Sequence, residues 1–205
     1  MWARKIYQDQ VPTGDLFYRA ASVLAGLALT SDGSSRLADA LGVLLRTWNA
    51  DYYRFHAFSR QHLADIDELV SKWRDKLVGF RSRSLGTFDV ADEEAMKELF
   101  PEFEKVLGQV GAAKALHLLA PRFFPPWDRG IASYYRIYLQ GRGTNADLYA
   151  SFMRRVRQQC ADLGGELAIG ENPLKTIDEF NYCLTQGLLH ESQSAPQCPL
   201  FRTRN

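Results

Sequence analysis

The sequence has few cysteines, no long apolar run and no large excess of either charge. Its three cysteines, Cys160, Cys183 and Cys198, are an odd number without a C-x-x-C pair, so neither a disulfide framework nor a zinc knuckle is expected. The longest uncharged stretch, residues 20–31, is shorter than the roughly 20 apolar residues of a membrane span. The N-terminal region also lacks the apolar run and small-residue cleavage site of a signal peptide. We therefore expect a soluble, cytoplasmic protein with no membrane partner.

The charge balance excludes one class of nucleic-acid-binding protein. Across 205 residues, 25 basic and 24 acidic side chains leave a net charge of +1. This excludes binding through bulk positive charge but is compatible with a local basic face. Hydrophobic residues make up 46% and aromatic residues 12%, which excludes disordered and fibrous proteins. We expect one globular domain over residues 1–190, a loosely ordered tail over residues 191–205, and a monomer.

The hydrophobic pattern predicts an all-α fold. Apolar residues recur at spacings of three and four near the start of the chain, at Leu37, Leu41, Leu44, Leu45 and Trp48. Residues 63–77 repeat this spacing, and no segment shows the alternation of a half-buried strand.

Polar residues at expected helix starts divide the rest of the chain. Asp89, Asp128 and Asn172 are expected to be N-cap residues, and Thr144 with Asp147 resembles a capping box. The expected helices cover residues 90–100, 112–120, 129–139, 144–163 and 173–187, with a turn at residues 108–111.

Two patterns that look like ligand sites are better explained as ordinary structure. Residues 141–146 match the dinucleotide fingerprint G-x-G-x-x-[GA] as a string, but a helix precedes the glycines where the fingerprint needs a strand, so no cofactor is expected. Cys183, His190 and Cys198 fit no zinc-ligand spacing, so no metal is expected. His117 lies between two leucines in an apolar helix, which favours a hydrogen-bonded core histidine.

Residues 108–132 carry the most information about function. Gly108 and Gly111 precede a helix whose first backbone N–H groups can bind a phosphate. After that helix, two prolines precede Trp127 and Asp128. A carboxylate at a helix N-terminus stays ionised, and beside an aromatic ring it suits the cleavage of a glycosidic bond, because it stabilises a cationic sugar and orients a water. The alternative is that Asp128 is only a helix cap, which is the more common role.

This segment resembles the helix-hairpin-helix DNA glycosylase superfamily, and especially small bacterial proteins similar to 8-oxoguanine glycosylases. Their K-x-L-H-x-L-x-P-x-x-F-P-x-W/Y-D stretch is matched by residues 114–128, and the hairpin L-P-G-V-G-x-K is echoed by residues 107–114. Gln109 replaces the middle glycine, and the glycine register puts Ala113 at the position of the lyase lysine. The resemblance therefore implies Asp-dependent hydrolysis rather than Schiff-base lyase chemistry.

The resemblance also implies roles for individual residues. Asp128 would stabilise the oxocarbenium-like transition state, and Lys114 would bind phosphate or polarise the leaving base. Residues 43–49 resemble the helix that lines the base pocket. The residues implied to bind DNA or the flipped base are Gly108, Val110, Gly111, Trp127, Trp48, Asn49, Tyr52 and Arg154. For the aromatic residues the alternative is a place in the core, and for Arg154 it is a solvated helix face.

Two further hypotheses stay open. A non-catalytic helical module that binds modified or distorted DNA would share the hairpin and the basic helix but would need nothing from Asp128. A helical scaffold that binds protein would show no affinity for DNA even at low salt, where phosphate contacts are strongest.

Overall fold

The computed structural model describes residues 2–10, 12–30 and 35–188. Over these ranges the fold is all-helical, as predicted, and contains no strand. The predicted tail, together with His190 and Cys198, lies outside the described residues. The elements are α1 (Trp2–Gln10), α2 (Pro12–Thr30), α3 (Ser35–Trp48), α4 (Ala50–Phe55), α5 (Arg60–Arg81), the 3-10 turn η1 (Leu85–Thr87), α6 (Val90–Leu119), α7 (Arg129–Tyr134), α8 (Ala146–Asp162), α9 (Glu166–Ile169) and α10 (Pro173–Thr185).

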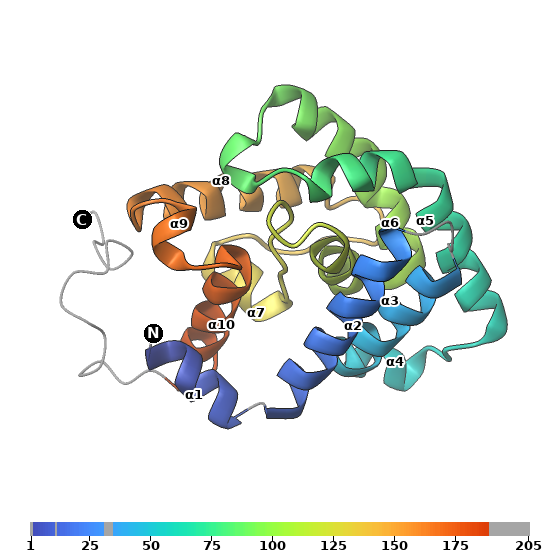
Figure 1. Ribbon diagram of the computed structural model, residues 1–205, viewed down its shortest axis with the longest axis horizontal. Coiled ribbons are helices and arrows are strands. Elements are labelled where there is room, and N and C mark those ends of the chain that lie inside the picture. The colour runs from blue at the N-terminus through green and yellow to red at the C-terminus, as the bar shows by residue number, and fades with distance from the viewer. Residues whose placement is uncertain (1, 11, 31–34, 189–205) are drawn as a thin grey trace.

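The helices form two groups around the second half of α6. Figure 1 shows α2 and α3 side by side in one group with α4 and α5, and α10, α1 and α9 gathered in the other, with α8 beside α9. The N-terminal helix α1 packs against α10, although the two are separated by most of the chain. Within the described ranges, no helix has both the length and the apolar character needed to cross a membrane.

The apolar stripes predicted for α3 and α5 face the core. Leu37, Leu41, Leu44 and Leu45 have no exposed surface, and Ile66 and Leu77 are equally buried on α5. Trp48, the last residue of the α3 stripe, is only half-buried. This exposure leaves its ring at the edge of the core.

Helix α6 begins as predicted but does not end as predicted. Asp89 and Asp92 form a reciprocal capping box, with Asp92 N donating to Asp89 Oδ1 at 2.9 Å. The end expected at residue 100 is wrong, because the helix continues past Pro101 to residue 119. The predicted four-residue turn is a kink at one residue, Gly108, with φ 78° and ψ 169°. The helix-hairpin-helix element stays a prediction.

The segment after α6 is shaped by contacts that are distant in sequence. The helix expected to run to residue 139 ends at Tyr134, and the chain then turns through Arg136, which has φ 56°. The Thr144 capping box is wrong. Thr144 instead donates to the Gly141 carbonyl, and the buried Asn145 precedes α8. The Asn172 cap of α10 is confirmed, since its side chain accepts from Lys175 N at 3.2 Å.

His117 is the core histidine that the sequence predicts. It is fully buried, Nδ1 donates to the Phe124 carbonyl at 2.9 Å, and Nε2 lies 3.1 Å from the Tyr18 hydroxyl. Burial lowers the pKa of His117 to about 3. The ring is therefore neutral at neutral pH, and the Tyr18 O–H donates to Nε2.

Candidate functional site

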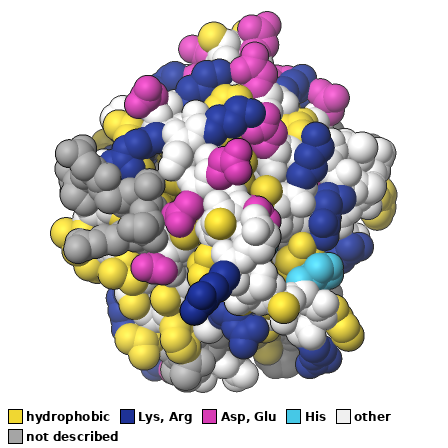
Figure 2. All heavy atoms as spheres, turned by 90° about the vertical axis from the view of Figure 1, so that its right-hand side faces the viewer, with side chains coloured by type: hydrophobic (Ala, Val, Ile, Leu, Met, Phe, Trp, Pro, Cys, Tyr) yellow, Lys and Arg dark blue, Asp and Glu magenta, His cyan; other side chains and the backbone are white. Residues whose placement is uncertain are grey.

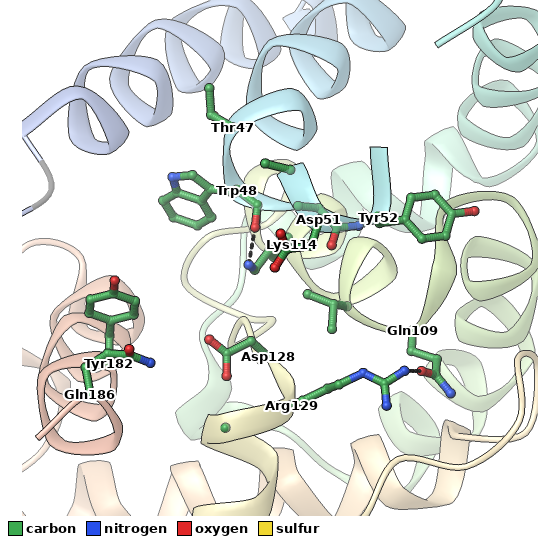
Figure 3. A pocket seen from close by; sticks show the side chains of 14 residues that line it. Thr47, Trp48, Asp51, Tyr52, Gln109, Lys114, Asp128, Arg129, Tyr182 and Gln186 are labelled. Atoms are coloured by element: carbon green, nitrogen blue, oxygen red, sulfur yellow. Dashed lines mark hydrogen bonds between the residues drawn. The ribbon is translucent and has the colours of Figure 1, made fainter. Parts of the chain in front are cut away.

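A cavity of about 570 Å³ lies where the end of α3, the short α4, the kinked part of α6, the start of α7 and the end of α10 meet (Figure 3). Six of the residues singled out from the sequence line it, namely Trp48, Asn49, Tyr52, Val110, Lys114 and Asp128. They come from segments up to 80 positions apart in the chain. The fold therefore brings together residues that the sequence offers only as separate motifs.

Asp128 is placed by the helix that it caps. Its Oδ1 accepts a hydrogen bond from Ile131 N at 2.8 Å, and its half-buried side chain points into the cavity (Figure 3). The preceding Trp127 is fully buried, and its Nε1 donates to the Gln109 carbonyl at 3.0 Å. Trp127 packs among Phe100 and Tyr149 and does not line the cavity. It thus fixes Asp128 relative to the α6 kink rather than offering a surface for stacking.

Lys114 lies on the opposite wall from Asp128. Its Nζ donates to the Trp48 backbone carbonyl, which is drawn as the dashed bond in Figure 3. Burial lowers the pKa of Lys114, while the carboxylates of Asp128 and Asp178 act in the opposite direction. A lysine with a lowered pKa more readily exists as the neutral amine, so it can accept a proton or act as a nucleophile.

The two hairpin glycines let the α3–α4 corner approach α6 closely. A Cβ on Gly108 would lie 2.8 Å from Tyr52 Cε2, and a Cβ on Gly111 would lie 3.0 Å from Asn49 Nδ2. Neither glycine lines the cavity, so both act by making room for residues that do.

Asn49 contributes a hydrogen-bond donor that the fold does not use. The residue is buried and lines the cavity, and among the described residues no atom accepts a hydrogen bond from its Nδ2. A buried donor without an acceptor costs free energy. A ligand with an acceptor group at this wall would remove that cost.

Lys114 lines the cavity as expected, but the arginine expected to bind DNA does not. Arg154 pairs with Glu93 and lies away from the cavity lining. Arg129 lines the cavity and donates to Gln109 Oε1 at 2.8 Å, while Arg142 donates to the Tyr52 hydroxyl at 2.9 Å. Figure 2 shows basic and acidic side chains interspersed over the face it presents, consistent with the balanced composition. Positive charge near the cavity is therefore local.

Helix α10 supplies site residues that the sequence analysis missed. Tyr182 and Gln186 line the cavity on the side facing Trp48 and Asp128 (Figure 3). Asp178 and Tyr182 are four residues apart on α10 and so share a helix face, and Gln186, the C-cap of α10, continues the same spacing. That polar and aromatic stripe is the signal that could have identified α10 as a wall of the site.

Two negative findings bear on the site. In the described part of the chain, no group of three or more His, Cys, Asp or Glu side chains could hold a metal ion. None of the family models, curated proteins and solved structures compared with this chain matches it.

Proposed function

We propose that the protein is a DNA glycosylase-like enzyme that takes a flipped, damaged or modified base into this cavity and hydrolyses its N-glycosidic bond. The observation that carries the proposal is the meeting of Asp128, Lys114, Trp48 and Asn49 around one cavity. Its volume of about 570 Å³ falls within the range of roughly 300–1,000 Å³ for small-molecule sites.

Each of these residues suits a step of the reaction. As the C1′–N bond breaks, its electron pair leaves with the base and positive charge develops on the sugar. The Asp128 carboxylate would stabilise that charge, while a water adds to C1′ and releases a proton to the carboxylate. Lys114 would donate a hydrogen bond to the departing base. Trp48 and Tyr52 offer aromatic surfaces for stacking, and Asn49 offers an unused donor.

The same neighbourhood suits a DNA backbone. The α6 segment after the Gly108 kink begins a new helical turn, and the N–H groups of such a turn favour anions. Arg129, bonded to Gln109, and Arg142, bonded to Tyr52, add positive charge there. Phosphates flanking an extruded nucleotide are the anions expected there.

The test is a single-turnover base-release assay on DNA carrying oxidised, deaminated, alkylated or hypermodified bases, with and without a later alkali step. We expect wild-type strand breaks that require alkali and that fall about 100-fold or more in Asp128→Asn, because the variant loses the charge that stabilises the transition state. Asp89→Asn is the matched control, since it makes the same change at another helix N-cap and asparagine caps as well as aspartate.

Other outcomes would replace the proposal. Breaks without alkali would assign a lyase role to Lys114. Bound DNA with no release from any substrate would favour a non-catalytic module for modified or distorted DNA. No binding even at low salt would favour a protein-binding scaffold.

A further inference from the structure

A buried lysine lies behind the cavity, in the first turn of α10. Lys175 is only 4% exposed. Its Nζ lies 3.1 Å from Glu179 Oε1 and 3.6 Å from Asp178 Oδ2, both on its own helix. An ammonium group removed from water costs several kcal/mol unless its surroundings compensate for it. Two carboxylates on one side supply part of that compensation.

Aromatic rings from three other helices also compensate for the removal of the Lys175 ammonium group from water. The Nζ of Lys175 lies 4.3 Å from the ring centroid of Tyr7 on α1, 5.0 Å from that of Trp48 on α3 and 5.6 Å from that of Tyr18 on α2. Ring faces attract cations through their quadrupole, and more strongly away from water. The charge of Lys175 therefore connects α10 to three helices of the N-terminal half.

The Lys175 side chain also lies beside a stacked pair of rings. The rings of Trp48 and Tyr18 are stacked, with centroids 4.9 Å apart and an interplanar angle of 8°. The Nζ of Lys175 lies 5.0 Å from the ring centroid of Trp48 and 5.6 Å from that of Tyr18, so it lies against both rings of this stacked pair. Trp48 also lines the cavity.

We propose that Lys175 is a positioning residue that holds the Trp48 indole with one face toward the cavity, as the platform on which the flipped base stacks. Lys114 fixes the backbone of the same residue through its carbonyl, and Lys175 fixes the ring. The proposal rests on the proposed function for its ligand, but the placement of the indole is independent of that function.

Two variants separate positioning from simple stability. Lys175→Met keeps an unbranched side chain that is one heavy atom shorter and removes the charge, whereas Lys175→Arg keeps a cation for the rings. Glu104→Gln is the structural control, because it weakens a buried hydrogen-bonded carboxylate that lies away from the cavity lining. All three are made in the Asp128→Asn background, so that binding is measured without turnover.

The first measurement is the affinity for duplex DNA with 2-aminopurine at the flipped position, compared with the same duplex carrying an abasic site. We expect Lys175→Met to weaken the base-dependent part of the affinity about tenfold, to leave the salt dependence unchanged, and to reduce the quenching of 2-aminopurine. Lys175→Arg should restore most of the loss, and Glu104→Gln should leave the base-dependent part unchanged. Equal effects of Lys175→Met and Glu104→Gln would overturn the proposal.

The second measurement does not need DNA. In ¹⁵N spectra of the indole N–H groups, assigned by Trp→Phe substitution, Lys175→Met should shift or broaden the Trp48 signal and leave that of Trp127 unchanged. An unchanged Trp48 signal would overturn the positioning role. A shifted signal in a protein that binds no DNA would leave the indole placement intact and reject the flipped base as its ligand, together with the proposed function.

Discussion

Two of the places where the described part of the molecule buries charge, at Glu104 and at Lys175, are built differently. Between α6 and α8, the fully buried Glu104 accepts hydrogen bonds from both the backbone N and the side-chain Nδ2 of Asn145. Asn145 Oδ1 in turn accepts from Gln140 N at 2.6 Å. Around Lys175, by contrast, carboxylates and ring faces surround a cation without such directional bonds to the backbone. The first arrangement fixes the path of the chain, and the second sets the surface of a neighbouring cavity.

The largest effect is expected where the directional bonds are removed. Glu104→Ala leaves the Asn145 backbone N without its acceptor, removes one acceptor of the Asn145 side-chain Nδ2 and opens a small void. We expect the free energy of unfolding, measured by urea titration, to fall by about 3 kcal/mol. Glu104→Gln keeps one acceptor oxygen and should cost less than half as much. If Glu104→Ala lowered the free energy of unfolding by less than about 1 kcal/mol, the directional bonds of Glu104 would not distinguish its region from that of Lys175.

The second prediction concerns the pH dependence of the Lys175 region. Burial raises the pKa of Asp178 to about 6 from its ordinary value of 3.8, although Lys175 and Lys114 oppose the shift. The folded state therefore binds more protons than the unfolded state between these values, and Asp178 makes stability fall as pH rises through that window. In Asp178→Asn this fall disappears. Compared with the wild type, Asp178→Asn should therefore gain about 2 kcal/mol in the free energy of unfolding at pH 7 relative to pH 4.

Urea titrations at pH 4, 5, 6 and 7 measure this change. His117 contributes the opposite slope, since its lowered pKa makes stability fall as pH drops below 6.5. That contribution is present in both proteins and cancels in the comparison. Parallel curves for the wild type and Asp178→Asn would show that Asp178 titrates normally.

A smaller loss of stability is expected at the α6 kink, where Tyr52 packs closely against Gly108. Gly108→Ala introduces a Cβ 2.8 Å from Tyr52 Cε2, in a backbone conformation that only glycine adopts readily. Gly165→Ala is the control, because Gly165 has nearly the same conformation (φ 91°, ψ 170°) with nothing within 4 Å of the added Cβ. We expect Gly108→Ala to be less stable than Gly165→Ala by about 1 kcal/mol in thermal or urea unfolding. Equal losses would mean that Tyr52 moves aside without cost.

The smallest effect is expected at the surface. Arg154→Gln breaks an exposed pair with Glu93 and should change the free energy of unfolding by less than about 0.5 kcal/mol. It should also leave DNA affinity unchanged. Arg142→Gln, next to the cavity, should weaken DNA binding and reduce the slope of log affinity against log salt by about one. The reverse result would move the DNA-binding face from the cavity to α8.

Local signals predicted much of the fold, and distant contacts explain the failures. The capping residues Asp89 and Asn172 act through neighbours three positions away, so the sequence is enough to identify them. Asn145, rather than Thr144, precedes α8 because Glu104, 41 positions earlier, binds it. In the same way, α6 passes Pro101 because its apolar residues on both sides are buried.

The sequence predicted those cavity residues that lie together in one short segment of the chain. Asp128 and Lys114 were found in one short segment, and both line the cavity. Trp127 was expected to stack on a base, but the Gln109 carbonyl, 18 positions earlier, binds its indole in the core. Tyr182 was missed because α10 reaches the cavity only through tertiary packing against α7 and α1.

The pairing of α1 with α10 has a consequence for the order of assembly during synthesis. Tyr7 contributes to the surroundings of Lys175, and its ring contacts Tyr182 edge-on at 5.5 Å. A nascent chain that has released α2 to α8 already contains Asp128, Lys114 and Trp48, but it has neither Lys175 nor the Tyr182 wall. The cavity is therefore completed only after the last described helix leaves the ribosome, so a truncated translation product would have the proposed reacting groups without an enclosed site.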